Sequence, residues 1–195
     1  MDIAISVDGG ISEKGTGHNN ADMSVNHRGA QYTMSHTCET ARRAIESRHF
    51  IGWHGLPPEC TPDALFGMAL NDQWGEMPLG NSFEPARSRL LEIGGYYRPM
   101  AYVRNGVVTM FDGMNPTLSC GWTELSDDLG TPEAKLDWIH GAVKMTGGER
   151  VHAGRGITVF INPENDFVIH VSLYVPATVE EYIRRLRLTR EKRQH

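Results

Sequence analysis

The chain has few cysteines: Cys38, Cys60 and Cys120 are the only three among its 195 residues. An odd number of cysteines without a close pair is not the pattern of a disulfide framework. We therefore expect free thiols and a cytoplasmic protein, because disulfides are rare in that compartment. No apolar run approaches the roughly 18 residues of a membrane span, so no membrane partner is predicted. No basic segment and no long apolar segment begins at residues 1–3, so no secretory signal is predicted.

An excess of basic charge is absent as well. Lys and Arg total 19, Asp and Glu total 24, and the formal net charge is −5. Domains that bind nucleic acid are usually basic, so this balance argues against a nucleic-acid partner. The chain also lacks a Gly-x-Ser-x-Gly elbow, a Walker loop and a His-Glu-x-x-His helix. We therefore expect no cofactor, and enzymatic activity is not favoured.

Several side chains that could bind zinc occur between residues 36 and 60. They are His36, Cys38, His49, His54 and Cys60. Structural zinc sites normally show paired ligands two to four residues apart on each side of the site. Here only His36 and Cys38 are close, and their spacing is tight for two ligands of one ion. No metal site is predicted.

One spacing pattern occurs twice in the chain, fifty residues apart. Leu79-Gly80 is followed, 26 residues after the glycine, by Gly106 and an apolar run. Leu129-Gly130 is followed at the same distance by Gly156 and a second apolar run. A period of this size is typical of a duplicated supersecondary unit. The hypothesis is two diverged repeats, over residues 79–116 and 129–175.

The second of these patterns carries a weak family resemblance. Leu129, Gly130, Pro132 and Gly156 form a Leu-Gly-x-Pro element ahead of a strand that begins after a glycine. This arrangement resembles small duplicated α+β proteins of the β-lactamase-inhibitor and outer-membrane-assembly lipoprotein kind. The chain lacks the lipobox cysteine of those lipoproteins. The resemblance implies an architecture and no functional residue.

Helix signals occur at four places. Thr37, Thr61 and Thr178 are suitable N-caps, and Glu181 completes a capping box with Thr178. Glu84-Pro85 is interpreted as the start of another helix, which ends at Gly94. The last helix is predicted over residues 178–193. Its many arginines either contact an acidic partner or complement the negative end of the helix dipole, and we favour the second interpretation.

Strand signals complete an α+β fold. Strands are predicted over residues 100–103, 107–111, 157–161 and 167–175, with a tight turn at Asn105-Gly106. Residues 1–36 are rich in turn-forming residues without a sustained apolar period, and are interpreted as a disordered extension that adds little to the core. We therefore predict one α+β domain over residues 37–195. Its antiparallel sheet would carry helices packed mainly on one face.

The strand over residues 167–175 provides the candidate site. Its side chains alternate, so that His170, Ser172 and Tyr174 point to one face, beside Thr158 and Phe160 of the neighbouring strand. Aromatic and polar side chains in one patch are typical of protein interfaces. The predicted binding residues are Thr158, Phe160, His170, Ser172 and Tyr174.

Two functions remain open at this point. The first is a non-enzymatic binding or accessory protein that presents a sheet face or edge to a peptide or protein partner, of which an immunity or inhibitor protein is a special case. The second is a small enzyme that uses acid–base or nucleophilic chemistry in a pocket beside the loop over residues 55–60. Its candidate residues are His152, His170, Tyr174 and Cys120.

Overall fold

The computed structural model describes residues 37–77, 79–80 and 85–188. These residues lie in one compact unit of the chain. The predicted extension over residues 1–36 lies outside the described residues, and so do residues 189–193 of the predicted C-terminal helix. Within the described residues this helix ends at Leu186, earlier than predicted, because Arg187 has an extended backbone conformation.

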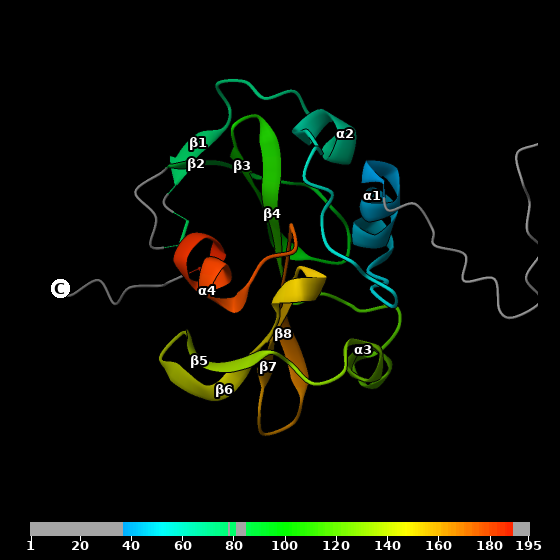
Figure 1. Cartoon of the computed structure of the whole chain (residues 1–195), viewed down its shortest axis with the longest axis vertical. Helices are drawn as coiled ribbons and strands as arrows, with labels where there is room; N and C mark the ends of the chain where they lie inside the picture. The colour runs from blue at the N-terminus through cyan, green and yellow to red at the C-terminus, as the bar shows by residue number, and fades with distance from the viewer. Residues whose placement is uncertain (1–36, 78, 81–84, 189–195) are drawn as a thin grey trace, which may run out of the picture. The chain divides into compact units, whose positions relative to one another are not determined.

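The described residues form one antiparallel sheet of eight strands (Figure 1). The order of the strands across the sheet is β1-β2-β3-β4-β8-β7-β6-β5. The antiparallel α+β class predicted from the sequence is therefore confirmed. The strands are β1 (Gly75–Met77), β2 (Ala86–Leu90), β3 (Tyr97–Arg104), β4 (Val107–Met114), β5 (Ala134–His140), β6 (Val143–His152), β7 (Ile157–Asn162) and β8 (Phe167–Tyr174).

The helices are short, and three of them begin at the predicted caps. The Thr37, Thr61 and Thr178 side chains each accept a backbone hydrogen bond from the first turn of a helix, which satisfies one of its unpaired amides. Glu181 completes the capping box with Thr178 as predicted. The helices are α1 (Cys38–Ser47), α2 (Pro62–Phe66), α3 (Trp122–Leu129) and α4 (Val179–Glu181), with a 3-10 turn at Ala153–Arg155. A π-helical turn, Tyr182–Leu186, continues α4, and we call residues 179–186 the C-terminal helix.

One local prediction fails, and two elements were not predicted. The helix expected to begin at Glu84-Pro85 is strand β2, in which buried Ala86 and Ser88 alternate with the less buried Arg87 and Arg89. This period of two is that of a strand with one buried face. The sequence patterns also did not predict α3 or the long β5–β6 hairpin. The hairpin predicted at Asn105-Gly106 is confirmed, and both turn residues have positive φ angles of 51° and 80°.

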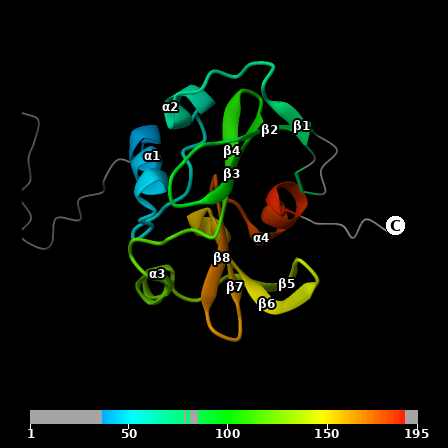
Figure 2. The ribbon, with the colours of Figure 1, turned by 180° about the vertical axis from the view of Figure 1, so that it is seen from behind.

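The sheet has a hydrophobic core on each face. The first core lies between the sheet and α1, α2 and α3, and it includes Ile45, Leu65, Phe111, Leu125 and Val171. The second lies beneath the C-terminal helix, and it includes Tyr102, Met110, Val151, Tyr174 and Tyr182. Figures 1 and 2 show the C-terminal helix on the other side of the sheet from α1, α2 and α3. In the described part of the chain, α1, α2 and α3 therefore lie on one face and the C-terminal helix covers part of the other.

The two glycines of the fifty-residue spacing each lie just ahead of a strand. Gly106 lies in the turn between β3 and β4, and Gly156 directly precedes β7. Strands β4 and β7 are the two neighbours of β8 in the sheet. The two glycines therefore lead into comparable strands, and the duplication stays a prediction.

The expectation of free thiols is wrong for two of the three cysteines. Cys38 and Cys60 form a disulfide, while Cys120 is a buried free thiol. Cys38 opens α1 and Cys60 immediately precedes the cap of α2, and packing of these helices brings the two Cα atoms to 5.6 Å. A separation of 22 residues hides this pairing in the sequence. The disulfide also removes both sulfurs from the set of candidate zinc ligands.

Candidate functional site

The five predicted binding residues lie together on the sheet face that carries the C-terminal helix. Thr158 is the cross-strand neighbour of Ser172, and Phe160 is the neighbour of His170. The Phe160 and His170 ring centroids are 5.0 Å apart, and the Thr158 and Tyr174 hydroxyls are 2.8 Å apart. All five side chains are buried, so they do not form the exposed patch that their alternation suggested.

The centre of this face holds a polar cluster that includes one residue missed by the sequence prediction. The Ser172 hydroxyl donates to Oδ1 of Asp112 at 2.7 Å, and Nε2 of His170 lies 2.5 Å from the same oxygen. Asp112 comes from β4, which pairs with β8 at this point. The sequence signal that could have identified Asp112 is a carboxylate within a mostly apolar strand. A buried charge of this kind requires partners.

The cluster is not a serine nucleophile activated by a histidine. Such an arrangement needs a hydrogen bond between the hydroxyl and the imidazole. Here the Ser172 hydroxyl and the His170 ring both contact Oδ1 of Asp112 instead. The arrangement binds one carboxylate oxygen tightly and fixes the orientation of the imidazole. A histidine oriented by a carboxylate is one component of an acid–base site.

One half of the face, which we call the covered half, lies under the C-terminal helix. The Tyr174 and Tyr182 rings stack with centroids 5.1 Å apart, and the Tyr182 hydroxyl donates to Oε1 of Glu149 at 2.8 Å. Arg187 donates to both carboxylate oxygens of Glu149. Burial raises the pKa of Tyr174 and that of Tyr182 well above the usual tyrosine value. Both phenols are therefore neutral structural groups near neutral pH, which weakens the case for Tyr174 as a catalyst.

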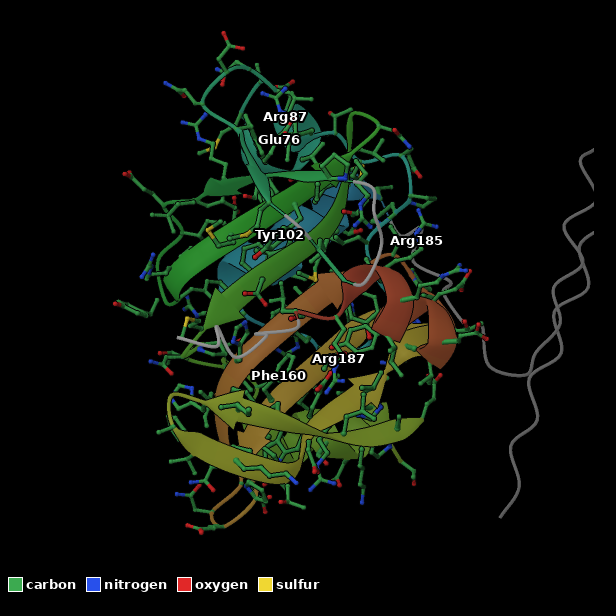
Figure 3. All side chains as sticks on the ribbon, turned by 90° about the vertical axis from the view of Figure 1, so that its left-hand side faces the viewer. Glu76, Arg87, Tyr102, Phe160, Arg185 and Arg187 are labelled. Atoms are coloured by element: carbon green, nitrogen blue, oxygen red, sulfur yellow. A yellow bond between two sulfur atoms is a disulfide. The ribbon has the colours of Figure 1, made fainter. Side chains whose placement is uncertain are left out.

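The other half of the face, which we call the open half, is lined by Leu90, Tyr97, Met100 and Met114. Leu90 is 52% exposed and Tyr97 is 56% exposed, while Met100 and Met114 are half-buried. Leu90 pairs with Met100, Met100 with Asp112, and Met114 with His170. The apolar row therefore leads across the strands to the Asp112–His170 pair. Figure 3 looks onto this face, with Tyr102 and Phe160 labelled and the C-terminal helix over one part of it.

Aromatic side chains extend the apolar row across β7 towards β5. The Trp138 ring centroid lies 5.2 Å from that of Phe160 and 5.4 Å from that of His140. Trp138 and His140 are half-buried, whereas Phe160 is buried. This edge of the open half thus offers ring faces and edges, beside the flexible thioethers of Met100 and Met114.

The other two residues proposed for an enzyme do not join this cluster. Cys120 belongs to the core beneath α1, α2 and α3, on the face of the sheet opposite to His170. His152 is buried at the end of β6. Burial lowers the pKa of His152, the Glu133 carboxylate opposes that change, and Arg155 and Arg150 reinforce it. The proposed Cys120–His170 pair is therefore not formed.

The buried His152 makes stability depend on pH. Its ordinary pKa is 6.5 and its folded-state pKa is lower, so the unfolded chain binds the proton more readily. The stability attributable to the neutral ring is present above pH 6.5 and is lost as the pH falls towards the folded-state pKa. We expect His152→Gln to flatten the change in urea midpoint between pH 7.5 and pH 5.5. The exposed His49, changed to Gln, is the control; an equal flattening in both variants would refute the assignment.

One fold can serve many functions, so the function of this protein depends on the residues of its candidate site. No group of three or more His, Cys, Asp or Glu side chains is placed to hold a metal ion among residues 37–77, 79–80 and 85–188. In the same ranges, no helix is both long and apolar enough to cross a membrane. Comparisons of this chain with protein-family models, with curated proteins and with solved structures found no match.

Proposed function

We propose that this protein binds a peptide or protein partner on the open half of its sheet. The observation that carries the proposal is the row of Leu90, Tyr97, Met100 and Met114, whose apolar side chains remain exposed or half-exposed on one face. The covered half of the same face is buried under the C-terminal helix. A contiguous apolar surface next to a covered one is typical of a docking site.

The chemistry of the row supports a peptide-like ligand. Methionine side chains are unbranched and polarizable, and they adapt to partners of varied shape. The half-buried rings of Trp138 and His140 add rigid surface, and aromatic rings are common at the centre of interfaces. Together they provide an adaptable part and a rigid part of one surface.

The sheet face is better suited to docking than the sheet edges. Strand β1 has only three residues, which is too short for extensive pairing with another chain. Strand β5 carries the exposed charges of Lys135 and Asp137, and the carbonyl of Asp137 already accepts a hydrogen bond from Arg187 at 2.7 Å. Charged side chains on an edge strand discourage strand addition.

The test places a charge in the open half. We expect Leu90→Asp to weaken partner binding at least ten-fold, about 1.4 kcal/mol or more, because a carboxylate would be desolvated in an apolar contact. The partner is first trapped in cells with a photo-crosslinking residue at position 97, and its affinity is then measured by calorimetry. Ile51, 39% exposed in the loop after α1, supplies the matched control Ile51→Asp. The photo-crosslinking residue is also placed at position 51 as a control. Equal crosslinking of the partner from positions 51 and 97 would refute the proposal, and so would an unchanged affinity of Leu90→Asp for the partner.

The second candidate is acid–base catalysis at His170. One observation favours it: the imidazole lies 2.5 Å from the buried Asp112 carboxylate, which would orient it as a base. Its Nδ1 atom would then exchange the proton with a substrate held in the open half. Under this alternative, a screen of the wild-type protein identifies a substrate, and His170→Gln abolishes its turnover. The same substitution lowers the affinity for that substrate much less than it lowers turnover. Under the binding proposal, no turnover depends on His170.

A further inference from the structure

The Asp112 carboxylate has an unusual environment for a charged group. Its side chain is only 6% exposed. Met100 is its neighbour on β3, and Met110 and Met114 lie two residues before and after it on β4, on the same face of the sheet. Three methionines thus flank one carboxylate. An apolar setting strengthens the attraction of a carboxylate for a cation, because less water screens the charge.

The hydrogen bonds of Asp112 involve only one of its two oxygens. Ser172 and His170 both contact Oδ1, and Oδ2 has no hydrogen-bond partner among the described residues. Oδ2 is also not among the fully buried polar atoms that lack a partner in this part of the chain. The Asp112 side chain retains a small exposed fraction, and its neighbours Met100 and Met114 belong to the open half. A carboxylate that is nine-tenths buried thus presents one oxygen to a ligand.

Among residues 37–77, 79–80 and 85–188, no lysine or arginine side chain forms an ion pair with Asp112. In this part of the chain, the ion pairs of Lys and Arg involve other acids, and the polar contacts of Asp112 are with His170 and Ser172. The net charge of the whole chain, −5, also favours a basic partner. A cation brought by the partner would complete the cluster.

We propose that the open half receives an arginine or lysine side chain of the partner, with its cationic group at Oδ2 of Asp112. The aliphatic stem would lie along Met100 and Met114, as long basic side chains do on apolar surfaces. The Phe160 ring packs against the His170 ring, which contacts the same carboxylate, so an aromatic cluster lies near the proposed cation. This inference rests on the proposed function and specifies the residue that the partner inserts.

The experiment uses the full chain and two small probes of equal stem length. n-Butylguanidinium carries the cation and n-butanol lacks it. Methionine residues are labelled with ¹³C-methyl groups, and the Met100 and Met114 signals are followed by NMR during titration. We expect saturable shifts with n-butylguanidinium and at least ten-fold weaker binding of n-butanol.

Two variants locate the cation. Asp112→Asn keeps the size and one acceptor oxygen of the side chain, and we expect it to weaken n-butylguanidinium binding at least ten-fold. Glu92→Gln removes an exposed carboxylate next to Leu91 and serves as the control, with unchanged binding. Thermal melting verifies that both variants fold. If Asp112→Asn fails to fold, the comparison of the two probes on the wild-type protein still tests the proposal.

Each outcome separates this inference from the proposed function. Equal shifts with both probes, or unchanged n-butylguanidinium binding in Asp112→Asn, would overturn the cationic anchor while leaving apolar docking in place. Absence of shifts at Met100 and Met114 with n-butylguanidinium would also overturn it. The proposed function itself stands or falls with the Leu90→Asp experiment, which involves no cation.

Discussion

Gly156→Ala is expected to destabilise the protein by more than about 4 kcal/mol, at the upper end of single-residue effects. Gly156 has a φ angle of 60°, which an L-amino acid rarely adopts. A Cβ atom there would lie 2.2 Å from the carbonyl oxygen of Tyr174 and 2.7 Å from the Cα of Gly55. Both clashes are with backbone, which cannot move aside as a side chain could.

The position of Gly156 explains why relaxation would be costly. Its carbonyl accepts hydrogen bonds from the amide of Tyr174 at 2.8 Å and from the Trp53 indole at 3.2 Å. The end of β8 and the loop after α1 therefore meet at this residue. A shift of Gly156 would therefore disturb both the end of β8 and the packing of Trp53 in the first core.

Gly106→Ala is the matched control. Gly106 also has a positive φ angle, 80°, but nothing lies within 4 Å of an added Cβ. Only backbone strain remains, so a loss of about 1 kcal/mol is expected. Urea denaturation of both variants measures the difference. Similar losses in the two variants would show that the close approach at Gly156 is not what requires glycine.

Glu149→Leu is expected to cost about 3 kcal/mol, because it removes the acceptor of a buried charge cluster. Glu149 is 1% exposed, and its carboxylate accepts from the Tyr182 hydroxyl and from two nitrogens of Arg187. The substitution leaves the Tyr182 hydroxyl and the Arg187 guanidinium without these partners. We expect the C-terminal helix to detach more readily from the covered half, with faster amide hydrogen exchange over residues 179–186.

A double-mutant cycle isolates the interaction. Adding Arg187→Leu to Glu149→Leu removes the second charge, and we expect part of the lost stability to return. The Asp137–Lys144 pair is the contrasting case, since both side chains are largely exposed. Replacing Lys144 by Gln is expected to change stability by less than about 1 kcal/mol. Equal losses at the two ion pairs would contradict the role of burial.

Some parts of the fold were predictable because they depend on neighbours in the sequence. The caps at Thr37, Thr61 and Thr178 and the turn at Asn105-Gly106 are decided within a few residues, and the structure confirms all four. The alternation of β8 likewise placed His170, Ser172 and Tyr174 on one face. Strand β2 was mistaken for a helix because its pairing with β1 and β3, rather than its own propensity, decides its conformation.

The composition and local patterns by themselves determined the α+β class, the antiparallel hairpin, three helix starts and the face on which the candidate residues lie. The tertiary structure alone decided that Cys38 meets Cys60, that the C-terminal helix covers half of that face, and that Asp112 lies against His170. The physical reason is distance along the chain: Asp112 and His170 are 58 residues apart. Only the pairing of β4 with β8 brings them together, and no local pattern specifies which strands pair.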